Sequence, residues 1–68
     1  MLVQERLRAL RKEKGETQVQ VATAIGIADR HYQRFEGGVN LPSLEKIWKL
    51  ADHFEVSIDY LVGRTDER

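Results

Sequence analysis

The sequence contains no cysteine, so no disulfide bond stabilises its fold and nothing in it indicates an oxidising compartment. It also lacks an apolar run close to the ~20 residues of a membrane-spanning helix. Its first residues, MLVQERLRALRKEK, are charged and amphipathic, whereas a signal peptide carries an apolar run and a small-residue cleavage site. We therefore expect a single cytoplasmic domain over residues 1–68, with no membrane partner. A domain this small has a stability of roughly 3–5 kcal/mol.

The chain also lacks a net charge, because its 11 basic residues balance its 11 acidic ones. The basic residues are concentrated at the start, where residues 1–15 hold five of them against two acidic residues. Domains that bind nucleic acid usually present a basic surface. Any electrostatic attraction to nucleic acid must therefore be local.

Hydrophobic spacing predicts an all-α fold, a compact five-helix domain without strands. Thr17 and Gln20 fit a capping box at the start of the second helix, and Ser57 is the expected N-cap of the fifth. The polar tail over residues 64–68 is expected to fray. The predicted helices cover residues 2–14, 17–25, 28–36, 43–54 and 58–62.

The second and third helices are joined by a tight turn at Gly26, which is the helix-turn-helix pattern. At about 100° per residue, Ala28, Tyr32 and Phe35 share one face of the third helix, and we expect them to anchor it. The opposite face carries polar side chains, namely Asp29, Arg30, Gln33 and Arg34. On an arbitrary helix such a face is most often simply solvated, so the helix-turn-helix frame is what favours a binding role.

Short motifs along most of the chain occur in a specific order. They are ERLRALRKEKG at 5–15, TQxxxA at 17–22, IGI at 25–27, RFEGG at 34–38, PSL at 42–44, KLADHF at 49–54 and VSIDYLVGR at 56–64. Each is weak alone, but together they resemble the Cro/repressor-type (Xre family) helix-turn-helix transcriptional regulators. The resemblance implies a lambda repressor-like DNA-binding fold in which the third helix enters the major groove of double-stranded DNA.

The resemblance also assigns roles to individual positions. Those that usually meet base edges are Asp29, Arg30 and Arg34, and Gln33 lies beside them as a further candidate for base contact. Positions at or near the phosphates are Thr17, Gln18, His31, Gly38, Val39 and Asn40, the last three through loop amides. The chemistry agrees, because Arg pairs with guanine, Gln with adenine, and an acid accepts from cytosine. Arg11 and Glu36 match a family ion pair that joins the first helix to the end of the third.

Asp29 has three roles open to it, because an acid close to phosphates is repulsive. Ala28 occupies the position where the family usually has Ser or Thr, so Asp29 is first interpreted as a substitute cap. It can also hold Arg30 or Arg34 in one rotamer, or read cytosine. A related departure is Glu55, which stands where Gly or Asn is common and is expected in the left-handed region.

The dimer candidates are Trp48, Ile58, Leu61 and Val62, centred on the last helix. Trp48 is expected to be partly buried. The predicted function is sequence-specific DNA binding by a homodimeric repressor on a near-palindromic operator. The alternative is a protein-interaction module, an antitoxin or repressor antagonist. We predict no enzyme activity, no cofactor and no metal site, since His31 and His53 lack ligand spacing.

Overall fold

The computed structural model describes residues 3–68, and in that part of the chain it contains five α-helices and no strand. This confirms the predicted all-α fold, and the helix boundaries lie within one residue of expectation, except for the predicted start at residue 2, which lies outside the described residues. None of the helices within residues 3–68 has the length and apolar character required to cross a membrane. The helices are α1 Val3–Lys14, α2 Gln18–Ile25, α3 Asp29–Glu36, α4 Leu44–Phe54 and α5 Ile58–Leu61.

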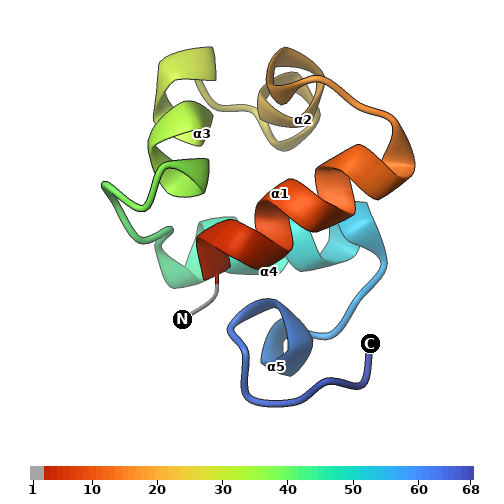
Figure 1. The fold of residues 1–68 in the computed structure, drawn as a ribbon. Coiled ribbons are helices and arrows are strands. Elements are labelled where there is room, and N and C mark those ends of the chain that lie inside the picture. Colours follow the sequence, from red (N-terminus) through yellow and green to blue (C-terminus); the bar gives the residue numbers. More distant parts are fainter. Residues whose placement is uncertain (1–2) are drawn as a thin grey trace.

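The helices surround a single apolar core. In Figure 1, α1 crosses in front of α4, with α2 and α3 on one side of this pair and α5 on the other. Every helix contributes at least one buried side chain. The core side chains are Leu7, Leu10, Val21, Ala22, Ile25, Tyr32, Phe35, Ile47, Leu50, Ala51, Phe54 and Leu61. The helical stripes recognised in the sequence therefore meet at one centre.

Side-chain caps begin three of the helices. The Thr17 hydroxyl accepts a hydrogen bond from the Gln20 amide at 3.0 Å, and the Gln20 side chain accepts one from the Thr17 amide at 2.8 Å. This reciprocal pair confirms the predicted capping box. Ser43 and Ser57 cap α4 and α5 by accepting from Lys46 and Tyr60. Helix α3 differs, because its N-cap is Ala28, which has no hydroxyl.

Two hydrogen bonds close the end of every helix, from the residue in the left-handed region and from the residue after it. At α4 the left-handed residue is Glu55, with φ 58°, which confirms the prediction. It is the one non-glycine residue with positive φ in residues 3–68. The Val56 amide donates to the Ala51 carbonyl at 3.0 Å and fixes this turn.

Three apolar side chains are exposed, and for Ala28 and Trp48 this differs from the prediction. Ala28 is exposed because it precedes α3 with an extended backbone, so the helical phase does not apply to it. Leu44 is 71% exposed, since it lies at the edge of the core face of α4 and in its first turn. Trp48 lies four residues after Leu44 and therefore next to it on the surface of α4. Its exposed fraction is 59%, whereas we expected it to be partly buried.

The C-terminal tail lies against α1, in contrast to the frayed tail that its polarity predicted. Arg6 donates to the carbonyls of Tyr60 and Thr65, and its guanidinium lies 4.0 Å from the centre of the Tyr60 ring. Arg68 forms two hydrogen bonds to the Glu13 carboxylate. These contacts connect α1 with α5 across more than fifty residues of sequence.

Candidate nucleic-acid interface

Helices α2 and α3 are joined by a turn in which Gly26 adopts φ 78°. The Ile27 amide donates to the Ala22 carbonyl at 3.0 Å, which closes α2 and turns the chain toward α3. Tyr32 and Phe35 are then buried against the core, at 0% and 2% exposure. The anchoring of α3 is thus as predicted for these two residues, without the contribution expected from Ala28.

The outer face of α3 is exposed along its whole length. Its side chains are Asp29, Arg30, Gln33 and Arg34, and all four are exposed. Within residues 3–68 none of their side chains forms a hydrogen bond or an ion pair. His31 is also exposed, with its ring 4.7 Å from that of Phe35. The structure therefore groups these predicted site residues on one surface with their polar groups available.

Asp29 does not cap α3 in the structure, which corrects the leading interpretation of this residue. It is the first residue inside the helix, whereas a capping oxygen belongs to the residue before it. Its carboxylate also forms no ion pair with Arg30 or Arg34 in the described part of the chain. What it retains is a favourable position at the positive end of the helix dipole. Of the three roles, base reading is the one that the structure leaves open.

Glu36, the last residue of α3, is buried at 3% exposure and holds three elements together. Arg11 of α1 donates to its two carboxylate oxygens, through Nε at 2.6 Å and Nη2 at 3.1 Å. Gln18 of α2 donates to Oε1 at 3.1 Å. The predicted Arg11–Glu36 ion pair is therefore present, as a two-pronged contact. It fixes the end of α3 relative to α1 and the start of α2.

The carboxylate of Glu36 remains ionised despite its position in the core. Burial alone raises its pKa, but the hydrogen bonds from Arg11, with further help from neighbouring groups, hold that pKa below its usual value. Close by, burial and then the Glu36 carboxylate raise the pKa of Tyr32. The Tyr32 hydroxyl has no hydrogen-bond partner among the described residues and stays protonated. The charged Arg11–Glu36 pair therefore lies close to the neutral phenol of Tyr32.

Gln18 and Thr17 are positioned by contacts within the protein. Gln18 is half-buried because its amide group reaches Glu36, so its orientation is fixed before any ligand arrives. The Thr17 hydroxyl is exposed and caps α2. Both lie at the amino end of α2, where backbone amides and the helix dipole favour an anion.

The backbone amides of the loop after α3 were expected to face phosphates, but they donate hydrogen bonds within the protein. Those of Gly38 and Val39 donate to the carbonyls of Phe35 and Arg34, at 3.2 and 3.0 Å, and that of Asn40 donates to Arg34 at 3.4 Å. These bonds close α3, with Gly38 in the left-handed region at φ 74°. Because the three amides already have acceptors, they are not free for phosphates. The side chains of Val39 and Asn40 are exposed.

Comparison with known proteins places this geometry in a family. The helix-turn-helix family model matches residues 7–61. The chain belongs to the helix-turn-helix family. This confirms the resemblance to Cro/repressor-type regulators that the sequence motifs indicated.

The helix-turn-helix domain is 46% identical, over 98% of its length, to the cryptic phage CTXphi transcriptional repressor RstR of Vibrio cholerae. It is 39% identical, over 94% of its length, to the HTH-type transcriptional regulator AnsR of Bacillus subtilis. It spans 62% and 55% of these two relatives. A solved structure of the P22 c2 repressor protein in complex with synthetic operator 9T superposes with a TM-score of 0.85, at 28% identity over 90% of this chain and 92% of the repressor chain.

Several cations of α1 have roles in this helix-turn-helix domain that no pattern in the sequence indicated. Arg8 donates to the Glu36 carbonyl at 3.0 Å and so stabilises the carboxyl end of α3. Lys14 donates to the His53 carbonyl at 3.0 Å, and Arg6 holds the tail. The spacing of apolar residues along the sequence does not predict polar contacts between distant residues. As a result, most of the basic side chains in residues 1–15 bind acceptors within the protein itself.

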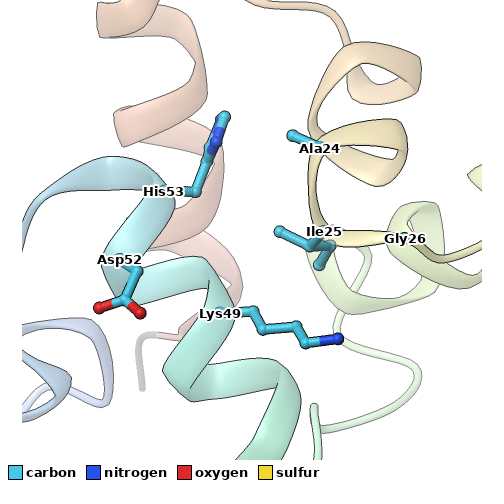
Figure 2. Close-up of a pocket in the computed structure, with 6 residues that line it drawn as sticks. All are labelled: Ala24, Ile25, Gly26, Lys49, Asp52 and His53. Carbon is cyan, nitrogen blue, oxygen red and sulfur yellow. The ribbon is translucent and has the colours of Figure 1, made fainter.

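The pocket between α2 and α4 lies apart from the outer face of α3. It is lined by Ala24, Ile25, Gly26, Lys49, Asp52 and His53. In Figure 2, the Lys49 side chain extends from α4 toward α2, whereas the Asp52 side chain points away from α2. The His53 ring is engaged elsewhere, with Nε2 2.7 Å from Oε1 of Glu16. This contact gives Glu16 a role in joining α4 to the loop before α2.

Proposed function

We propose that this helix-turn-helix domain binds double-stranded DNA in a sequence-specific manner, as a repressor that occupies an operator as a homodimer. The observation that carries the proposal is the outer face of α3, which is exposed, polar and free of internal partners within residues 3–68. A helix with one such face matches the width of the major groove. The names of the relatives, a repressor and a transcriptional regulator, and the operator complex of the structural neighbour support it.

The proposed base contacts follow from side-chain chemistry. Arg30 and Arg34 each present paired donors suited to guanine O6 and N7, and Gln33 presents a donor and an acceptor suited to adenine. Asp29 accepts from the amino group of cytosine in this scheme. Its position in the first turn of α3 supports this, because the amino end of a recognition helix contacts base edges.

The proposed phosphate contacts lie beside that face. Thr17 and Gln18 occupy the amino end of α2, His31 is exposed next to Arg30, and the exposed side chain of Asn40 follows α3. With the loop amides engaged and the α1 cations used internally, few cations remain for phosphates. We therefore propose a weak dependence of affinity on salt.

The matched family is one of transcription regulators, and we propose that the domain acts by binding rather than by catalysis. It would do so in the cytoplasm, where bacterial and phage operators lie. The alternative function is that of an antitoxin or repressor antagonist which contacts a protein through the same fold. Its support is the zero net charge together with the internal use of Arg6, Arg8 and Arg11.

The test is the sequence preference of Arg30→Ala. On a fragment selected from random duplexes, this variant is expected to lose about 10- to 100-fold in discrimination at one base pair, equivalent to 1–3 kcal/mol. The matched control is Arg64→Ala, which removes the same charge from an exposed position after α5, a helix that lies on the opposite side of α1 and α4 from α3 (Figure 1). Full discrimination by Arg30→Ala would remove α3 from the reading role. Absence of any bound fragment at low salt would favour the protein-interaction alternative.

A further inference from the structure

His31 is a titratable side chain beside the proposed reading surface, and the internal contacts of the protein do not use its charge. It is exposed, and within residues 3–68 its ring nitrogens form no hydrogen bond and no ion pair. Histidine is the side chain that ordinarily changes its charge between about pH 5 and pH 8. The charge of His31 is therefore open to control by a ligand that binds this surface.

The ring of His31 is supported by α3 itself. Its centre lies 4.7 Å from that of Phe35, one turn further along the helix, with an angle of 51° between the rings. Phe35 is buried at 2% exposure, so this support is anchored in the core. Arg34 lies three residues after His31 and is therefore its neighbour on the helix surface. The imidazole is thus held next to a proposed base-reading side chain.

The elements packed against α3 give His31 no acidic partner. Helix α2 carries no charged residue, and neither does the loop after α3. The charged α1 side chains that reach α3 are Arg8 and Arg11, and both bind Glu36. Asp29 precedes His31 by two residues, which places it about 200° away around the helix. An external anion is therefore the group that can compensate a positive charge on His31.

The second histidine of the chain, His53, is already engaged. Its Nε2 lies 2.7 Å from Oε1 of Glu16, and its side chain is only 15% exposed. It belongs to α4 and not to the outer face of α3. However, Glu16 directly precedes Thr17 at the amino end of α2, so His53 is the group against which any effect of His31 must be controlled.

One proton makes a large difference to the charge of the outer face of α3. Arg30 and Arg34 oppose Asp29 there, so the net charge is 2 − 1 = +1 with His31 neutral and +2 with His31 protonated. Most basic side chains of residues 1–15 bind acceptors within the protein and do not add to it. Affinity for DNA rises with the number of phosphates that cations neutralise. Protonation of one imidazole therefore doubles the net positive charge that this face presents to DNA.

We propose that DNA binding by this domain is linked to the uptake of a proton by His31, so that affinity rises as the pH falls. This regulation rests on the proposed function and acts at the same surface. A protonated imidazole donates a charge-assisted hydrogen bond to a phosphate oxygen, which is stronger than the bond from a neutral ring. Because phosphate favours the protonated ring, protonation favours DNA binding to the same extent.

The affinity of the native chain is measured for the duplex that it selects from random sequences, at about pH 5.5 and about pH 8, where histidine is ordinarily mostly charged and mostly neutral. We expect binding to be about 3- to 10-fold tighter at the lower pH, because hydrogen bonds to charged groups are the stronger ones. The slope of log affinity against log salt should steepen by about 0.9 for each bound chain, the contribution of one more phosphate contact. Equal affinities and equal slopes at the two pH values would overturn the proposal.

Two substitutions fix the charge at position 31 in its alternative states. His31→Lys should bind at both pH values with an affinity close to that of the native chain at the lower pH. His31→Gln should bind at both with the affinity of the native chain at the higher pH. Circular dichroism melts at each pH establish that every chain compared is folded.

His53→Gln is the matched control and should retain the native response to pH, because His53 lies outside α3. A response that persists in His31→Gln, or that is lost in a folded His53→Gln, would reject His31 as the proton acceptor. Sequence-specific binding that is independent of pH contradicts the proton linkage alone. Absence of binding by the native chain at either pH contradicts the proposed function itself.

Discussion

Glu36 is the one charged side chain that is buried within residues 3–68, and it connects α1, α2 and α3. Its neighbours depend on it: without the carboxylate, the Arg11 guanidinium and the Gln18 amide lose an acceptor in a largely desolvated place. The position of α3, and hence of the proposed reading surface, depends on this residue although it faces away from that surface.

Removal of this carboxylate by Glu36→Ala is expected to destabilise the protein by about 3–5 kcal/mol, because one partner of a buried pair is left uncompensated. That is comparable to the total stability of a domain of this size, so the variant should be largely unfolded at 25 °C. Thermal and urea melts monitored by circular dichroism measure this. Glu45→Ala is the control, since its carboxylate is 69% exposed and exposed pairs contribute little. Equal melting temperatures for the two variants would contradict the role of Glu36.

The depressed pKa of Glu36 also predicts how stability depends on pH. A carboxyl group whose pKa is lower in the folded state stabilises the fold fully above its unfolded pKa, about 4.3, and this stabilisation is lost as the pH falls through the folded value. The gap in melting temperature between the native chain and Glu36→Gln should therefore be widest near neutral pH and shrink below about pH 4. Glu67→Gln, at an exposed tail position, should follow the native curve throughout. A gap in melting temperature that stays constant with pH would show that folding does not lower the pKa of Glu36.

At the scale of the elements, the helix ends show how closely local sequence determines this fold. Capping residues at the starts of α2, α4 and α5, and glycines after α1, α2, α3 and α5, mark these boundaries within one residue. Helical phase correctly predicted that Tyr32 and Phe35 anchor α3, but it also assigned Ala28 to that face, since periodicity ignores where the helix begins. Long-range polar contacts such as Glu16–His53 and Arg68–Glu13 carried no sequence signal at all.

The proposed site was predicted to a similar extent. The outer face of α3 followed from helical phase, and the Arg11–Glu36 pair followed from family resemblance. What the sequence did not predict was the state of the groups: that Asp29 stands inside the helix and caps nothing, and that the loop amides are already engaged. These depend on the path of the backbone over one or two residues.

Glu55 is the element-level site where the sequence conflicts with the conformation. With φ 58°, its Cβ is strained, and Glu55→Gly should stabilise the protein by about 0.5–1 kcal/mol, after the greater entropy of unfolded glycine is subtracted. Thermal melts measure the change. Glu55→Ala is the control, because it removes the same carboxylate but retains the Cβ, and it should give no gain. A gain shared by both variants would indicate charge rather than strain.

On the scale of the whole molecule, charge is what separates this domain from a strongly basic DNA-binding module. The net charge is zero, and Arg6, Arg8 and Arg11 are used to hold the fold together. The proposed affinity must then come from contacts to bases and from dimerisation more than from attraction to the phosphates. We expect sequence-specific binding to persist at salt concentrations at which a strongly basic domain no longer binds DNA.

Sequence-specific DNA binding is decided by the affinity of the native chain for duplexes from its own upstream region, measured by fluorescence anisotropy at increasing salt. We predict that one near-palindromic duplex binds at least about 1,000-fold more tightly than its scrambled version. The logarithm of its affinity should fall linearly with the logarithm of salt concentration, with a small slope that reflects few phosphate contacts. Equal affinity for the two duplexes, or no binding to either at low salt, would contradict sequence-specific binding by this domain.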